Sequence, residues 1–376
     1  MLVSVTLFLG AQVPNVFVLS PRFLGDRGYH EDEIGVVMGA FSLASLVISP
    51  LVGWFCLRFG HARVMAVGCL VAGAGAAGFA LADGPAGFAA GRALQGFGFA
   101  QVLVGAAAYV AETAPPGRLG EALGLAGVLT LAAQAVGPVI AAVLRDTVSW
   151  SAVWWFGAGA GVAGAAVAIA LPPVARHEAA DDGPRGPAMA PLAATVLAGV
   201  GFGAIWTFLA DHGPEAGAAY VTPFFVAYVA AAISVRLFMG TLSDRIGRRQ
   251  AAAPALLGHA LILVAMAFLG ATWQLVPIGL VYGFCHGVYY PTMQAVVVER
   301  SGGRRSRAVA AATFAFGGGV TGAAFVLGPI AKAFGYPAIY LVAAACGAVA
   351  AGLVWWERSS AKSAEAWPTA PPTSPS

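Results

Sequence analysis

The sequence predicts an all-α membrane protein with twelve transmembrane helices arranged as two pseudo-symmetric six-helix halves. Three observations predict this fold class. Of the 376 residues, 59% are hydrophobic and only 10% are charged, which is too apolar for a soluble domain. Apolar runs of about 20 residues, the length that crosses a bilayer, recur along the whole chain. A loop motif that starts at Gly53 returns at Gly240, half a chain length later, which indicates a unit built twice.

The composition also excludes several classes of protein. The mean hydropathy of +0.80 makes the lipid bilayer the expected solvent, and the 50 glycines then serve as close-packing surfaces between helices. A formal charge of +3 is too small to indicate a nucleic-acid partner. The four cysteines form no CxxC pair, so neither a zinc site nor a disulfide framework is predicted, and no metal or cofactor is expected.

The spanning segments are bounded by charges or by proline and glycine clusters. The first is interpreted as a spanning helix rather than a signal peptide, because it has no basic leader and no small-residue cleavage site. The predicted limits of the segments, in chain order, are 2–20, 34–57, 62–82, 86–110, 120–144, 151–171, 191–211, 218–240, 251–271, 274–298, 307–331 and 337–356.

The polar run 172–190 is the long interruption inside the chain, and it predicts two domains. We expect an N-terminal half at 1–171, a cytoplasmic linker at 172–190 and a C-terminal half at 191–356. The tail 357–376 is rich in Ser, Pro, Ala and Thr without an apolar period, so we expect it to be disordered and cytoplasmic.

The distribution of Lys and Arg predicts the orientation, because basic loops stay on the cytoplasmic side during insertion. With both termini inside, the inner loops and the tail hold 14 of the 20 basic residues, the outer loops hold 4, and Arg92 and Arg236 lie within helices. We therefore expect a multi-pass protein of the inner, cytoplasmic membrane with both termini cytoplasmic, acting as a monomer.

Three further motifs carry a family resemblance. The second copy of the loop motif reads Gly240-Thr-Leu-Ser-Asp244-Arg245-Ile-Gly247-Arg248-Arg249. Segment 86–110 contains Gly91-Arg92-Ala-Leu-Gln95-Gly96-Phe-Gly98, and segment 120–144 contains Gly137-Pro138. With twelve helices and a central linker, this chain resembles the major facilitator superfamily of secondary transporters, and especially its drug- and metabolite-efflux members.

The resemblance implies gating roles, and two positions depart from the family pattern. It implies that Gly240, Asp244, Arg245, Gly247, Arg248, Arg249, Gly137 and Pro138 gate the conformational change, with Asp244 docking near a helix start at Gly120-Glu121 when the inner side is closed. The first copy carries Leu57 where the motif has its aspartate, so this latch would be one-sided, and the loop charges could instead only anchor the loop. Ala141 and Ala142 replace the glycines that follow Gly-Pro in exporters, which weakens the export assignment.

Polar residues at membrane depth predict the substrate site, because such groups are costly unless they face a cavity or a partner. Arg92, Gln95 and Phe99 share one helix face, although Arg92 could instead be satisfied by backbone carbonyls. The other candidates for substrate binding are Gln12, Asn15, Trp206, Tyr282, His286 and Tyr289, of which the histidine and tyrosines could alternatively bridge neighbouring helices. Together they predict a cavity for an amphiphilic or weakly charged organic solute.

Proton coupling has no acidic candidate at mid-depth. The remaining titratable candidates are His286, His259, Asp211 and Glu33, and His286 stands out because it lies between two tyrosines on one helix face. The predicted function is therefore proton-coupled efflux of a small organic solute by alternating access. Uptake of an organic acid by symport and a non-transporting sensor or scaffold remain the alternatives. An enzyme is not expected, since no nucleophile and base pair, metal cluster or phosphate-binding loop is present.

Overall fold

Each predicted segment corresponds to a helix in the computed structural model, which describes residues 1–115, 118–174, 189–239, 245–300 and 305–365. The described residues contain no strand. The N-terminal half consists of α1 (Leu2–Val16), η1 (Phe17–Leu19), α2 (Ser20–Asp26), α3 (Glu31–Phe59), α4 (His61–Ala80), α5 (Pro85–Thr113), α6 (Leu119–Thr147) and α7 (Trp150–Ile169). The C-terminal half consists of α8 (Met189–Glu215), α9 (Thr222–Phe238), α11 (Arg248–Ala267), η2 (Thr272–Gln274), α12 (Leu275–Arg300), α13 (Arg305–Phe334) and α14 (Tyr336–Glu365).

Ten helices in the described residues are long and apolar enough to cross a membrane. The first of them joins α1, η1 and α2 into one rod over Leu2–Asp26, longer than the predicted 2–20. The apolar helix α9 is shorter, with 17 residues. The 26-residue helix α12 falls outside the apolar set because tyrosines, a histidine and a glutamine interrupt its sequence. Most residues of α12 are buried, in keeping with a polar helix at membrane depth whose side chains are surrounded by protein.

One face of α3 carries an exposed stripe of apolar side chains, which suits contact with lipid. Leu43, Val47 and Leu51 follow one another at every fourth position, and all three are exposed. Such a stripe would be unfavourable in water, but lipid chains are as apolar as leucine. The opposite face of α3 packs on α5 and, across the molecule, on α13.

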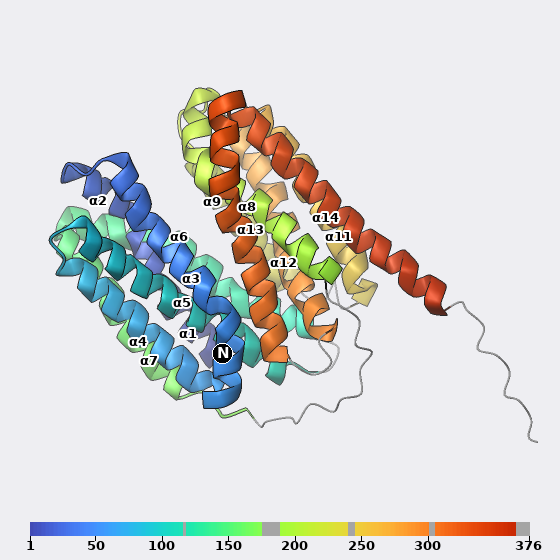
Figure 1. Cartoon of the computed structure of the whole chain (residues 1–376), viewed down its shortest axis with the longest axis horizontal. Helices are drawn as coiled ribbons and strands as arrows, with labels where there is room; N and C mark the ends of the chain where they lie inside the picture. Colours follow the sequence, from blue (N-terminus) through green and yellow to red (C-terminus); the bar gives the residue numbers. More distant parts are fainter. Residues whose placement is uncertain (116–117, 175–188, 240–244, 301–304, 366–376) are drawn as a thin grey trace, which may run out of the picture.

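The internal repeat predicted from the sequence is visible in the packing. In the N-terminal half, α4 packs on α5 and α7, α3 on α5, and α1 on α6 and α7. In the C-terminal half, α11 packs on α12 and α14, α9 on α12, and α8 on α13 and α14. When α1, α3, α4, α5, α6 and α7 are matched in order with α8, α9, α11, α12, α13 and α14, every one of these pairs has its counterpart. Figure 1 shows the two bundles side by side.

The two copies of the loop motif share a backbone feature. Gly60 and Gly247 each precede the helix that follows the motif, and their φ angles are +87° and +94°. An L side chain strongly disfavours this region, whereas glycine adopts it readily. The repeated glycine thus sets the same turn between α3 and α4 and before α11.

The halves meet most closely at the end of the molecule where α7 stops and α8 starts, here called the linker end. Across the halves, α13 packs on α3 and α5, while α6 packs on α9 and α12. One continuous apolar cluster crosses the boundary there, and we call it the linker-end seal; it includes Val110, Leu119, Leu123, Val298 and Val309. Toward the opposite end the bundles diverge, as Figure 1 shows. The structure is therefore one in which the linker end is closed.

Candidate functional site

A cavity of about 330 Å³ lies between the two halves, beyond the linker-end seal. Helices α3, α5 and α6 form one wall, and α8, α9, α12 and α13 form the other. Its lining residues are Phe41, Ser42, Ser45, Leu46, Ser49, Phe99, Leu103, Gly127, Thr130, Leu131, Gln134, Phe202, Tyr228, Arg236, His286, Tyr290, Thr313, Phe316, Gly317, Val320 and Thr321. Because both halves contribute walls, any relative motion of the halves changes its shape and access.

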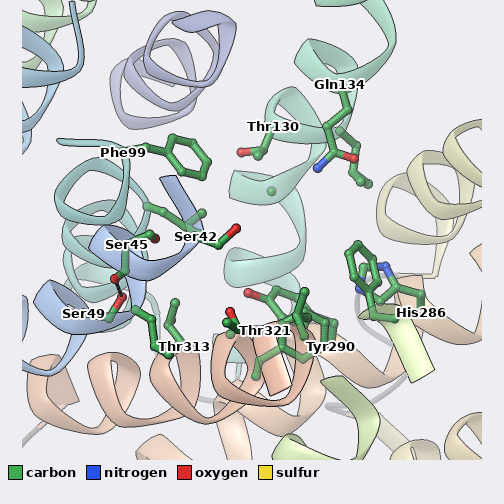
Figure 2. A pocket seen from close by; sticks show the side chains of 18 of the residues that line it. Ser42, Ser45, Ser49, Phe99, Thr130, Gln134, His286, Tyr290, Thr313 and Thr321 are labelled. Carbon is green, nitrogen blue, oxygen red and sulfur yellow. Dashed lines mark hydrogen bonds between the residues drawn. The ribbon is translucent and has the colours of Figure 1, made fainter. Parts of the chain in front are cut away.

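The lining combines aromatic rings with neutral hydroxyls. Figure 2 shows Ser42, Ser45 and Ser49 along α3, with Thr313 and Thr321 facing them from α13. The hydroxyl of Ser49 donates to the backbone oxygen of Ser45 at 2.6 Å, so it is already satisfied within its own helix. The serines repeat at helical spacing, which could have marked them in the sequence, but they were not among the predicted site residues. This surface suits a solute with both apolar and polar parts.

Arg236 of α9 is the one cationic arginine among the residues that line the cavity, and none of those lining residues is acidic. Its side chain crosses to the other half, where a Cβ atom built on Gly127 of α6 would overlap the guanidinium Nη1. The residue is 5% exposed, and its Nε has no hydrogen-bond partner in the described part of the chain.

His286 is the predicted site residue that the structure places in the cavity wall. Its Nδ1 lies 3.0 Å from the hydroxyl of Tyr228, and its Nε2 has no partner among the described residues. The rings of Phe202 and Tyr290 lie 5.1 and 5.3 Å from the imidazole, centroid to centroid. An imidazole with one nitrogen free of a hydrogen-bond partner can exchange a proton there. In the tautomer that leaves this nitrogen unprotonated, it can also accept a hydrogen bond from a bound solute.

The other aromatic candidates lie behind this wall. Tyr282 and Tyr289 face His259 of α11, with ring centroids 4.9 and 5.2 Å from the imidazole. All three side chains are buried, and none of them lines the cavity. Trp206 stacks on Phe202 at 4.1 Å and so supports a lining residue from the second layer.

Arg92 and Gln95 lie inside the N-terminal half. The Nη1 of Arg92 donates to Oε1 of Gln95 at 2.5 Å, and its guanidinium carbon lies 4.7 Å from the ring centroid of Phe41. Neither residue lines this cavity, although Phe41 and Phe99, their neighbours, do. Arg92 is thus held between a glutamine and an aromatic ring, one layer behind the wall.

Gln12 and Asn15 lie where α1 meets α6. A Cβ atom on Gly137 would stand 2.5 Å from the Cβ of Asn15 and 3.2 Å from Oε1 of Gln12. The Nδ2 of Asn15 donates to the backbone oxygen of Ala11, and neither residue lines the cavity. Gly137 therefore permits the tight α1–α6 packing, and Pro138 follows it inside α6.

The predicted gating loop is partly described. Gly240 and Asp244 lie outside the described residues. Arg245 is exposed, whereas Arg248 forms an ion pair with Glu299 at the end of α12. Its Nη1 also lies 3.5 Å from the backbone oxygen of Ala295. Arg248 therefore ties the start of α11 to α12 within the C-terminal half, and Arg249 occupies the same first turn.

Two predicted proton-coupling candidates are distant from the cavity or not described. Glu33 accepts a hydrogen bond from the backbone nitrogen of His30 at 3.0 Å and caps the start of α3. The side chain of Asp211 lies outside the described residues. His286 is accordingly the proton-coupling candidate that lines the cavity.

Two matched six-helix bundles stand on either side of one central cavity, and the sequence match to a family model identifies the family. The family model described as Major Facilitator Superfamily matches residues 1–210 and 192–375. The chain belongs to the major facilitator superfamily. It is accordingly a member of a transporter family and not an enzyme, and the predicted all-α membrane fold is confirmed.

Solved structures share this fold over nearly the whole chain. The human organic anion transporter MFSD10 (TETRAN) superposes with a TM-score of 0.79 at 17% identity, covering 94% of this chain and 98% of that one. The E. coli fucose:proton symporter FucP superposes with a TM-score of 0.77 at 17% identity, covering 94% and 97%.

Curated relatives match over shorter segments. The tetracenomycin C resistance and export protein of Streptomyces glaucescens is 27% identical over 165 residues, which are 44% of this chain and 31% of that protein. The multidrug resistance protein MdtG of Dickeya zeae is 28% identical over 122 residues, 31% of this chain and 29% of that protein. The chain thus spans about a third of the length of the curated relatives it matches.

Proposed function

We propose that this member of the superfamily exports a small amphiphilic organic solute across the inner membrane in exchange for protons. The observation that carries the proposal is the cavity between the halves, which is walled by both bundles and closed at the linker end. The matched packing of the two halves supports rocking about this cavity, since pseudo-symmetric pairs can exchange roles as one end opens and the other closes.

The direction is proposed from two kinds of support. Two of the relatives that match in sequence are named for resistance, and one of those for export. The excess of basic residues in the loops supports a cytoplasmic linker end with both termini inside, and we propose that the protein acts as a monomer. With this orientation, the closed linker end leaves the other end of the cavity toward the outer side, where an exporter would release its solute and take up a proton.

The proton is proposed to bind His286. In the tautomer whose Nδ1–H donates to the hydroxyl of Tyr228, Nε2 is unprotonated and has no partner in the described residues, so protonation of Nε2 would add a donor without breaking that contact. His259 is a weaker candidate because it is fully buried among Tyr282 and Tyr289, away from the cavity. Asp211 and Glu33 remain candidates only if both histidines prove dispensable.

We expect His286→Gln to abolish transport driven by a pH gradient and to retain solute binding, because glutamine keeps a hydrogen-bonding group but cannot carry the proton. The measurement uses purified protein in proteoliposomes, with the membrane potential clamped by potassium and valinomycin. Two permanently charged aromatic probes are tested, radiolabelled 2-naphthalenesulfonate and N-methylquinolinium. Each probe is tested with the pH gradient imposed in either direction. His259→Gln is the matched control and should lose less than half of the rate.

Movement of either probe against its gradient, toward the acidic side, supports antiport. Movement of neither probe by the parent protein would contradict the proposed function. Movement toward the alkaline side would favour the symport alternative, and full gradient-driven transport in the His286→Gln, His259→Gln double variant would remove histidine from the mechanism.

A further inference from the structure

We infer that the solute of this cavity is an organic anion with an aromatic or otherwise apolar body, and that Arg236 binds its anionic group. This inference rests on the proposed function, because it assigns a substrate class to the same cavity. The residues that carry it are Arg236 and Gly127, together with the rings of Phe202 and Phe316.

Arg236 carries a buried positive charge. A guanidinium stays protonated in proteins, and a charge buried in a membrane protein is costly unless it is paired or faces polar space. Arg236 is 5% exposed and lines the cavity, and its Nε has no hydrogen-bond partner among the described residues. The empty side of this cation therefore lies toward the cavity.

The residues that line the cavity offer no acidic side chain to balance the charge of Arg236. At the linker end, Glu121 forms an ion pair with Arg118, and Glu299 forms one with Arg248. An anionic group on the solute would supply the missing charge, and a guanidinium suits sulfonate or carboxylate oxygens because its donors form a planar fork.

The two buried arginines, Arg92 and Arg236, have different surroundings. Arg92 donates to Gln95 and lies against Phe41 and Phe17, with its guanidinium carbon 4.7 and 5.6 Å from the two ring centroids. It is thus partly satisfied within its own half and does not line the cavity. Arg236 crosses between the halves instead, so an anion bound to it would touch both moving units.

Aromatic side chains on both walls of the cavity suit an aromatic solute. Phe202 and Phe316 stand 5.4 Å apart, centroid to centroid, in an edge-to-face arrangement. Phe41 and Phe99 line the opposite wall at 6.0 Å from each other. A volume of about 330 Å³ is at the small end of the roughly 300–1,000 Å³ typical of ligand sites. The cavity therefore fits one small aromatic anion.

The test measures binding by isothermal titration calorimetry, with the full-length protein in lipid nanodiscs at pH 7. Three probes share a bicyclic aromatic body and differ in charge: 2-naphthalenesulfonate, 2-naphthalenesulfonamide and N-methylquinolinium. We expect the sulfonate to bind at least tenfold more tightly than the sulfonamide, and the cation to bind most weakly. Arg236→Gln should reduce the preference for the sulfonate to less than threefold, and Arg236→Lys should retain part of it.

Substitutions of Gly127 and Gly124 test the site while leaving Arg236 unchanged. Gly127→Ala should weaken sulfonate binding, because the new Cβ displaces Nη1 of Arg236. Gly124→Ala should not, because its Cβ would stay 3.8 Å from the Cγ of Arg236. Arg145→Gln removes the same charge outside the cavity and is the control for net charge. If Arg236→Gln does not yield folded protein, the Arg236→Lys and Gly127→Ala variants decide the result.

The outcomes separate this inference from the proposed function. Tighter binding of the cation, an unchanged preference in Arg236→Gln, loss of the preference in Arg92→Gln instead, or no binding of any probe would each overturn the inference. Proton-driven transport of N-methylquinolinium but not of the sulfonate would also overturn it, while leaving proton antiport intact. Transport of the sulfonate without any dependence on the pH gradient would support the anion site and contradict antiport.

Discussion

Replacing Gly75 by leucine should prevent the N-terminal half from folding. A Cβ atom at this position of α4 would stand 2.5 Å from the backbone oxygen of Gly91 and 2.7 Å from the backbone nitrogen of Gln95, both on α5. Backbone atoms of a packed helix cannot move aside as a flexible side chain can. We expect destabilisation of about 3 kcal/mol or more, and at least a tenfold loss of monodisperse protein after detergent extraction.

Gly78→Leu is the matched control for this prediction. Gly78 lies one turn further along α4, is exposed, and has no atom within 4 Å of its Cβ direction. The same leucine there would face lipid, so yield and melting temperature should stay at parent values. Equal yields for the two variants would show that the close approach of α4 and α5 is not required for folding.

Val309→Asp should break the linker-end seal. Val309 of α13 is fully buried in the apolar cluster that joins the two halves. A carboxylate there has no described partner to gain in the closed state, whereas opening of the linker end would hydrate it. A cost of about 3 kcal/mol would shift the equilibrium between closed and open states by roughly a hundredfold. Transport in proteoliposomes should fall at least tenfold.

Val309→Thr serves as the control because threonine has nearly the same shape and no charge, and its hydroxyl can bond to its own helix backbone. It should transport at more than half of the parent rate. Size-exclusion profiles and melting curves distinguish a shifted equilibrium from unfolding. Parent-level transport by a folded Val309→Asp variant would mean that the apolar cluster does not seal the linker end.

The fold could be predicted from the sequence because its signals are local. Length of apolar run, proline and glycine boundaries and the repeated motif each act within about 20 residues, and the structure places a helix on every predicted segment. Even α12 was recognised, although its polar residues lower its hydropathy. The ends were less accurate. The first spanning helix continues to Asp26, beyond the predicted limit at Ser20, and α14 continues to Glu365, into the tail that was expected to be disordered.

The cavity could be predicted only in part, because helix rotation depends on packing between helices. His286 lines the cavity with Tyr290, one turn away, whereas Tyr282 and Tyr289 from the same predicted stripe turn toward α11. The sequence placed Arg236 within a helix but did not select it for the cavity, because its reach to Gly127 depends on the position of the other half.

The serines of α3 left no strong signal for a different reason. A serine in a membrane helix can bond to the carbonyl four residues earlier, as Ser49 does with Ser45, and so costs little wherever it points. Its presence does not reveal whether it faces lipid, protein or a cavity. A buried arginine or histidine is costly at any of these places, which is why such residues were selected first.

An anionic solute would also favour the proposed export in energetic terms. An inside-negative membrane potential favours the exit of one negative charge by about 2.3 kcal/mol per 100 mV. Exchange of an anion for an entering proton would draw on both the potential and the pH gradient. A monovalent cation exchanged one for one with a proton would draw nothing from the potential, and it would be repelled by the charge of Arg236.

The central claim is that the two halves alternately open the cavity at its two ends. Double electron–electron resonance tests it most directly, with the four native cysteines replaced and spin labels introduced in pairs. One pair, at Asp83 and Tyr220, reports on the end away from the linker, and the other, at Thr113 and Arg307, reports on the linker end. Between pH 8 and pH 6, and on adding 2-naphthalenesulfonate, the first distance should shorten as the second lengthens. Two distances that stay fixed, or that change in the same direction, would contradict alternating access in this protein.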